Sequence, residues 1–258
     1  MTSNAVEHQK HGAVYRMTIN RAERRNAVTS DVIAGIREGI VAAHADPAVR
    51  AMVLTGAGDK AFCAGADLKP GQRFSYDHAK PGTDFVDMLR HVRTSTLPLV
   101  ARVNGTCLAG GTGLLAMCDM AVAADHARFG MPEVRIGLFP MQIYVVLKER
   151  VNPIKLNEWC LTGETFDAEE ARAGGLVNYV VPAAELDAKL DWLLARIVDK
   201  SPTAIRRGKY AMNAMNSMSF EQAAAYAESQ IPTLAMTEDA VEGKRAFNEK
   251  RKPNWTGR

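Results

Sequence analysis

The sequence predicts an α/β fold that ends in a helical region. Segments with the pattern of strands alternate with segments of helical spacing in the first part of the chain, which favours a mostly parallel sheet. After Pro140 the helical pattern dominates and only one short strand interrupts it. We therefore expect a strand-rich body over residues 1–200 and a purely helical region over 201–258.

The elements of the body follow in order from their apolar spacing. Residues 14–20 alternate apolar and polar side chains as a half-buried strand does, whereas 30–46 carries apolar residues at helical spacing after a capping Thr29 or Ser30. Further strands are predicted at 51–56, 98–105 and 119–125, and a further helix at 85–95.

The second half is predicted to be mainly helical. Helices are expected at 142–151, 153–161, 167–175, 183–198 and within 202–252, with a strand at 175–181. Gly174 and Gly175 mark the helix end before that strand. Residues 69–84 hold two Pro-Gly pairs, which predicts a mobile loop.

Composition excludes several classes of protein. The 258 residues carry a formal charge of only +3, too mild for the electrostatic footprint of a nucleic-acid or membrane-surface protein. The four cysteines at 63, 107, 118 and 160 show no metal-binding spacing, so we expect buried reduced thiols and no metal. With no apolar signal core at the amino terminus and no apolar run long enough for a membrane span, a cytoplasmic protein is expected.

Two glycine-rich segments are the strongest chemical signal. Residues 55–69 and 104–119 each follow or end an apolar strand and place small residues where a backbone N–H can approach a ligand. The dinucleotide pattern G-x-G-x-x-A occurs at both 56–61 and 111–116, too loosely placed to favour a nicotinamide site. A pair of convergent amides instead indicates an oxyanion hole.

These loops, together with "NRAERRNAVTS", "FGMPEVRIGL", "GETFDAEEARAGGLVNYVVP" and "TEDAVEGKRAFNEKRKPNW", resemble the crotonase family, also called enoyl-CoA hydratase/isomerase. The resemblance spans 14–255. It implies a crotonase-like spiral of ββα units, with a helical carboxyl-terminal region that drives assembly into a homotrimer, or a hexamer as a dimer of trimers. It also implies acyl-CoA substrates, with no cofactor beyond the coenzyme A that the substrate carries.

The resemblance further implies a catalytic set of Ala66, Gly110 and Glu133. The amides of Ala66 and Gly110 would hold the thioester oxygen, and Glu133 would move the proton. Hydratases of the family carry a second glutamate at the position of Gly113, and its absence here favours single-base isomerisation of a Δ3 to a Δ2 double bond. Hydration stays open as an alternative, with Thr112, Gln142 or Tyr144 holding water.

Coenzyme A contacts are also implied by the resemblance. They are expected at Arg25, Ala27, Ala64, Asp67 and Lys69, at Phe139 beside the acyl group, and at Phe247 and Lys250 reaching a neighbouring subunit's ligand. As for the aspartates, the residues alone favour a turn or cap role for Asp67 and Asp119 over a base. The basic tail fits a solvated helix end equally well, or, in a noncatalytic member of the fold, an RNA-binding or scaffold role.

Overall fold

The computed structural model describes residues 5–67, 79 and 81–258. Most of the predicted loop 69–84, including Lys69, lies outside these residues. The larger of two sheets has the strand order β1-β2-β3-β5-β7-β10, in which only β1 is antiparallel to its neighbour. Its strands are β1 (Val6–His11), β2 (Val14–Ile19), β3 (Ala51–Gly56), β5 (Leu99–Val103), β7 (Met120–Ala124) and β10 (Tyr179–Val181).

A second, smaller sheet has the order β4-β6-β8-β9, with the first three strands parallel. Its strands are β4 (Ala61–Cys63), β6 (Thr106–Leu108), β8 (Phe129–Gly130) and β9 (Thr165–Phe166). Along the chain β3 leads to β4, β5 to β6 and β7 to β8, and a helix follows each pair. This repetition is the spiral of ββα units that the family resemblance implied.

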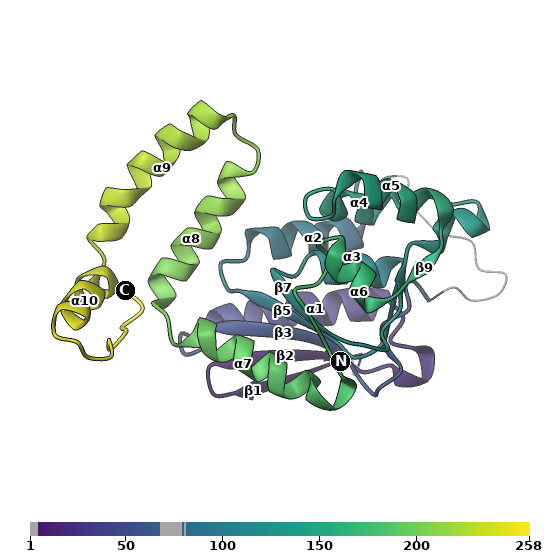
Figure 1. Ribbon diagram of the computed structural model, residues 1–258, viewed down its shortest axis with the longest axis horizontal. Coiled ribbons are helices and arrows are strands. Elements are labelled where there is room, and N and C mark those ends of the chain that lie inside the picture. Colours follow the sequence, from purple (N-terminus) through teal and green to yellow (C-terminus); the bar gives the residue numbers. More distant parts are fainter. Residues whose placement is uncertain (1–4, 68–78, 80) are drawn as a thin grey trace.

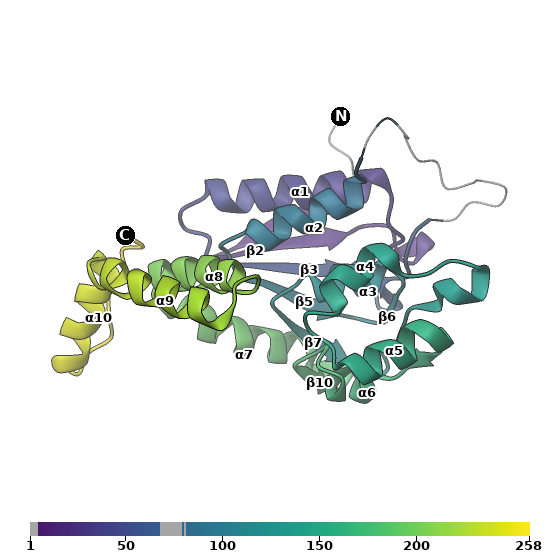
Figure 2. The same ribbon diagram turned by 90° about the horizontal axis from the view of Figure 1, so that it is seen from above.

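Helices cover both faces of the larger sheet (Figure 2). On β3, Met52 and Leu54 face one core cluster, whereas Ala51 and Val53 face the other, as the two-residue period of a strand requires. The first cluster includes apolar residues of α1 (Ser30–Ala45) and α2 (Asp84–Thr94), and the second those of α7 (Leu186–Val198). β3 is therefore buried on both sides, which explains its nearly continuous apolar sequence.

Further helices surround the smaller sheet and join the body to its carboxyl-terminal part. They are α3 (Gly110–Ala116), α4 (Met141–Leu147), α5 (Pro153–Thr162) and α6 (Ala168–Ala173), with the 3-10 turns η1 (Ala22–Arg24), η2 (Pro132–Ile136) and η3 (Ala183–Glu185). No helix among the described residues is long and apolar enough to cross a lipid bilayer.

The last three helices extend away from the sheets (Figure 1). They are α8 (Pro202–Met215), α9 (Phe220–Ala235) and α10 (Glu238–Asn248). Each begins at a hydroxyl cap, and the cap of α9 is a full capping box between Ser219 and Gln222. No residue of α9 is buried in the single chain, so its apolar side chains remain exposed.

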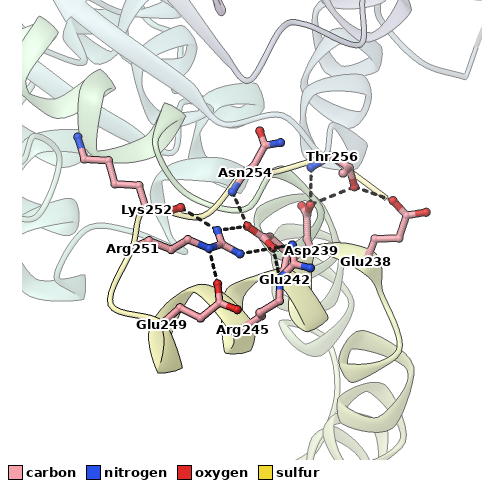
Figure 3. Close-up of polar contacts among 9 residues, drawn as sticks. All are labelled: Glu238, Asp239, Glu242, Arg245, Glu249, Arg251, Lys252, Asn254 and Thr256. Atoms are coloured by element: carbon pink, nitrogen blue, oxygen red, sulfur yellow. Dashed lines mark hydrogen bonds and ion pairs between the residues drawn. The ribbon is translucent and has the colours of Figure 1, made fainter.

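Two buried carboxylates fasten the end of the chain to α10 (Figure 3). Asp239 accepts hydrogen bonds from Ser201 Oγ at 2.8 Å, from Thr256 N at 2.9 Å and from Gly257 N at 3.0 Å. Glu242 accepts from Arg251 Nη1 at 2.6 Å and Asn254 N at 2.7 Å, and also pairs with Arg245. We call these contacts the tail clasp. Two basic side chains of the tail, Arg245 and Arg251, are thus paired within it.

The predicted elements are confirmed for β2, β3, β5, β7 and β10 and for the long helices, with local corrections, whereas β1 was not predicted. Thr29, rather than Ser30, caps α1, since its Oγ1 accepts from Val32 N at 3.3 Å. The helix predicted over 142–151 ends at Leu147, and the strand predicted over 175–181 begins only at Tyr179. Before it, Asn178 Oδ1 accepts the amide of Ala121 at 2.8 Å, so this residue joins the sheet through its side chain.

Candidate active site

Three neighbouring parallel strands carry the candidate catalytic positions to one edge of the smaller sheet. β4, β6 and β8 end at Cys63, Leu108 and Gly130. Ala66, Gly110 and Glu133 follow these ends by two or three residues. Because parallel strands end at the same edge, the topology brings these three positions together, as is usual for sites in parallel sheets.

The amides of Ala66 and Gly110 lie side by side. A Cβ built on Gly110 would be 3.9 Å from Ala66 N. Val28 N donates to Gly65 O at 2.8 Å and Asp67 N donates to Val28 O at 3.0 Å, so the N–H of the intervening Ala66 points away from this ladder. Gly110 is the first residue of α3, where an N–H has no partner within the helix.

Neither amide donates to an acceptor in the part of the chain that the structure describes. Two unused N–H groups that are adjacent at a helix start suit an oxygen that gains negative charge during a reaction. The arrangement can therefore serve as an oxyanion hole.

Backbone conformation at two residues sets this geometry. Gly65 has φ +97°, and a Cβ on it would lie only 2.9 Å from Ala109 Cβ. Ala109 itself has φ 49° and ψ −123°, a rare conformation for a residue with a side chain, and the next amide is that of Gly110. Strain of this kind typically amounts to about 1–3 kcal/mol and gathers at functional sites. Here the strained residue orients one of the two candidate donors.

An arginine clamp holds the loop that carries Ala66. Asp67 Oδ2 pairs with Arg21 and Oδ1 with Arg24, both at 2.8 Å, and the two guanidinium hydrogen bonds hold the pKa of Asp67 below its usual range. Both carboxylate oxygens are engaged, so Asp67 joins two loops rather than capping a turn. Asp119, also interpreted as a turn or cap residue, instead accepts Leu99 N at 2.7 Å and pairs with Lys209 at 2.6 Å.

Asn26 fixes the other loop of the clamp. It is fully buried, with φ 55°, and its Nδ2 donates to Ala57 O at 3.0 Å and Ala61 O at 2.7 Å while its Oδ1 accepts from Arg21 N at 3.1 Å. The sequence alone gave no role to Asn26 or Arg21. The available signal was the acid Asp67 in "AGADL", which has the charge to pair with the basic run "RAERR".

The predicted coenzyme A residues fall into two groups in the structure. Arg25 O accepts Ala64 N at 3.0 Å, which places Arg25, Ala27, Ala64 and Asp67 on two touching loops beside Ala66. Phe247 and Lys250 lie at the end of α10, which the view shows far from the smaller sheet of its own chain (Figure 1). Lys69 lies outside the described residues.

Glu133 has the environment of a proton carrier. It lies in η2 directly after Pro132, and its Oε2 is buried without a hydrogen-bond partner among the described residues. Burial raises the pKa of Glu133, although its own backbone N–H opposes the shift. Nearby, burial and the charge of Glu133 raise the pKa of the Cys160 thiol to about 11. A carboxylate with a raised pKa and an unused oxygen is suited to accept a proton from a ligand.

Apolar side chains follow Glu133 along the chain. Phe139 and Tyr144 are partly buried against the core, with ring centroids 6.4 Å apart. Phe139 lies two residues before α4, which begins at Met141.

Two of the three side chains considered for holding water are engaged elsewhere. Thr112 is fully buried, with its Oγ1 at 3.1 Å from both Cys107 O and Gly130 O, and Gln142 Nε2 donates to Thr83 Oγ1 at 3.2 Å. Thr112 is therefore not placed to hold water at the pocket. Its side chain is fully buried, and the one proton of its hydroxyl goes to a backbone carbonyl.

The thiols and acids of the described chain form no metal-binding group. No three His, Cys, Asp or Glu side chains cluster suitably in that part of the chain, and all four cysteines are buried and unpaired. Burial raises the pKa of the Cys63 thiol to about 12, as expected for a structural cysteine.

Comparison with known proteins places these features in a family. The model of the enoyl-CoA hydratase/isomerase family matches residues 9–258. The crotonyl-CoA hydratase of Syntrophomonas wolfei is 35% identical over 92% of both chains, and the carnitinyl-CoA dehydratase of Escherichia coli K12 is 33% identical over 99% of this chain and all of that one. The crystal structure of an enoyl-CoA hydratase from Mycobacterium smegmatis superimposes with a TM-score of 0.91 at 33% identity, over 97% of this chain and 98% of that one.

The match extends over almost the whole length of this chain and of these relatives, and the fold superimposes on the solved structure. The chain therefore belongs to the enoyl-CoA hydratase/isomerase family.

Proposed function

We propose that the chain is an enoyl-CoA isomerase that moves a double bond from Δ3 to Δ2 with Glu133 as its only acid-base group. The thioester oxygen is held by the amides of Ala66 and Gly110. The observation that carries this proposal is the pairing of one buried, unpartnered carboxyl oxygen at Glu133 with a glycine, rather than a second acid, at position 113.

The reaction follows from these three groups. Glu133 takes a proton from C2 of the 3-enoyl thioester, and the electron pair of that C–H bond becomes a C1–C2 double bond while the carbonyl oxygen gains the charge. The two amides stabilise this dienolate. Glu133 then returns the proton to C4, where the electron pair of the C3–C4 double bond forms the new C–H bond. The pair of the C1–C2 double bond moves to C2–C3, and the oxygen recovers its carbonyl bond.

The decisive experiment compares wild type with Glu133→Gln on 3-hexenoyl-CoA and on crotonyl-CoA, following migration and hydration separately. The proposal expects migration that falls by a factor of about 10² to 10⁴ in the variant, as for removal of a general base. Migration that survives the substitution contradicts the role of Glu133. Rapid hydration of crotonyl-CoA by wild type contradicts single-base specificity.

Hydration is the second candidate, and the activities for which the similar proteins are named favour it. Of the two relatives named above, one is a hydratase and the other is a dehydratase. Such a reaction requires a group that positions water, and Tyr144 is the remaining candidate of the three considered. Loss of hydration in Tyr144→Phe, with migration unchanged, supports this second function.

We also propose that the chain assembles into a homotrimer, or a hexamer of two trimers, through its helical region. Large apolar side chains on α8, α9 and α10 are exposed in the single chain, which is costly unless another surface covers them. They include Tyr210, Met212, Phe220, Ile231 and Phe247, and Met236 just after α9 is exposed as well. Light scattering coupled to size exclusion measures the state directly, and a monomer contradicts the proposal.

A noncatalytic RNA-binding role has less support. In the tail clasp, Arg245 and Arg251 pair with Glu242 and are not free for phosphates. RNA binding that weakens steeply with salt and is lost on deletion of 244–258 supports this role instead.

A further inference from the structure

The place of a second acid at position 113 is physically filled. A Cβ on Gly113 would overlap Ile143 Cγ2, lie 2.9 Å from Ile143 Cβ and lie 3.3 Å from Phe85 Cζ. Contacts below about 3.0 Å are not tolerated by real Cβ atoms, so α3 and α4 fit together only with glycine at this position. Gly113 therefore leaves no open space in which water takes the place of the missing acid.

This contact lies beside the candidate oxyanion hole. Gly113 and Gly110 are three residues apart in α3 and so share one face of the helix, about 5–6 Å apart. The carbonyl that Gly110 holds is two bonds from C3 of the acyl group, which is the atom that hydration attacks. Ile143 and Phe85 thus lie within reach of the part of the substrate where water would act.

The side chains that fill the space are apolar and firmly placed. Ile143 is 3% exposed and packs in the core cluster, while Phe85, partly buried, packs against the same cluster. The first turn of α4 is closed by Tyr144 N, which donates to Pro140 O at 2.9 Å. Hydrocarbon surface gives water no hydrogen-bond partner, so a water molecule at this wall is disfavoured.

We infer that Ile143 determines reaction specificity by excluding water and any second acid from the C3 side of the acyl group. Hydration forms a C–O bond to C3 and requires one group to take the proton of water while a proton reaches C2. With Ile143 in place, only proton transfer by Glu133 remains. The inference rests on the proposed function, because it assumes that the acyl group extends from the amides of Ala66 and Gly110.

The test uses four variants and two substrates. Ile143→Ala removes Cγ1, Cγ2 and Cδ1, and Ile143→Val removes one carbon and keeps the chain testable if the larger truncation unfolds it. Gly113→Glu introduces the acid alone, and Gly113→Glu with Ile143→Gly removes both Ile143 atoms that a Cβ would meet closest. Crotonyl-CoA hydration and 3-hexenoyl-CoA migration are measured for each, with circular dichroism to verify folding.

The ratio of hydration to migration is the readout. It is expected to rise at least tenfold in Ile143→Ala, less in Ile143→Val, and the double variant is expected to hydrate at least tenfold faster than Gly113→Glu. Ile40→Ala, which truncates an isoleucine that is 1% exposed in α1, controls for lost packing and leaves the ratio unchanged. Loss of stability alone does not move this ratio.

The inference is overturned if folded Ile143→Ala, or Ile143→Val where the former does not fold, keeps the wild-type ratio and the double variant hydrates no faster than Gly113→Glu. Failure of the proposed function has a different signature, namely no Glu133-dependent migration in wild type. The comparison between the double variant and Gly113→Glu needs no migration, so the two failures are distinguishable.

Discussion

Gly65 and Ala109 face each other across the two loops of the candidate oxyanion hole, so closely that a Cβ on Gly65 would lie 2.9 Å from Ala109 Cβ and 3.7 Å from Gly110 N. The separation of the two donor amides is therefore set by the absence of a single methyl group. Gly65 also has φ +97°, which a side chain disfavours.

Gly65→Ala is expected to push the loops apart and weaken one donor. Loss of one oxyanion donor typically costs about 2.7–4 kcal/mol of barrier, so kcat is expected to fall by a factor of about 10² to 10³. Steady-state kinetics on 3-hexenoyl-CoA measures it. Gly58→Ala is the matched control, because Gly58 also has positive φ but its Cβ would meet only Ala22 Cβ at 3.6 Å. Equal losses in both variants would assign the effect to backbone strain alone.

The raised pKa of Glu133 predicts the acid side of the pH profile. Glu133 must be ionised to take a proton, so kcat/KM is expected to decline as pH falls through a pKa above the ordinary range of glutamate, and Glu133→Gln should lack this limb. A limb at the ordinary pKa of glutamate would contradict the buried environment.

The stability of the fold should also depend on Glu133, but here the neutral carboxyl is favourable, whereas catalysis needs the ionised one. A fold that raises a carboxyl pKa favours the neutral form, so wild type is expected to be less stable than Glu133→Gln above that pKa and equal to it below the unfolded-state pKa. Thermal unfolding of the two proteins at pH 3 and pH 8 measures the difference. A larger difference at pH 3 would reverse the sign and exclude this assignment.

The tail clasp predicts acid sensitivity at the other end of the molecule. Burial alone would raise the pKa of Asp239, but hydrogen bonds from Ser201 and from the amides of Gly257, Thr256 and Thr203 outweigh it and hold the pKa at about 2. The stability from this group is therefore present above the unfolded-state pKa of about 3.9 and is lost as pH falls through about 2.

Asp239→Asn is expected to destabilise the docked tail by about 2 kcal/mol, as for lost hydrogen bonds to a charged group. Hydrogen exchange of the amides of residues 254–258 should become faster at pH 7. Glu238→Gln, which alters an exposed neighbour bonded to Thr256 Oγ1 at 2.9 Å, is the control and should change exchange little. Unchanged protection in Asp239→Asn would show that the clasp does not depend on this carboxylate.

Lys250 tests the proposed contribution of α10 to a neighbouring subunit's coenzyme A. Lys250→Glu reverses one exposed charge, so the Kd for a coenzyme A thioester is expected to rise by a factor of about 3 to 10, in line with the modest energies of exposed ion pairs. Lys244→Glu, at an exposed lysine of α10 six residues before Lys250, is the control. Calorimetry measures binding and light scattering verifies the oligomer. Equal effects of the two substitutions would indicate a general charge effect.

Much of this arrangement was predictable because its signals are long. The strands β2, β3, β5 and β7 and the helices α1, α2, α5 and α7 to α10 each span five or more residues, enough to show a period, whereas Glu133 was expected from the family resemblance. The strands β4, β6, β8 and β9 have only two or three residues, too few for a period, so they were hidden inside the glycine-rich loops and β9 inside a helical region. The amphipathic β1 was missed as well.

Local sequence also did not reveal what fills position 113. The missing acid was visible in the chain itself, but Ile143 and Phe85 come from α4 and α2, 30 and 28 residues away, and only the packing of three helices brings them to Gly113. The clamp of Asp67 by Arg21 and Arg24 is similar, since the two arginines lie 46 and 43 residues before Asp67. Such contacts depend on tertiary structure rather than on any local pattern.

An oxyanion hole made from the amides of residues 66 and 110 is invisible to alanine scanning, because Ala66 is already alanine and neither group belongs to a side chain. Replacing each amide in turn by an ester removes a single N–H and keeps every side chain, which semisynthesis of the chain permits. In a site built this way, the proposed donors depend on the path of the backbone, so a change of side chain such as the glycine at position 113 leaves them in place.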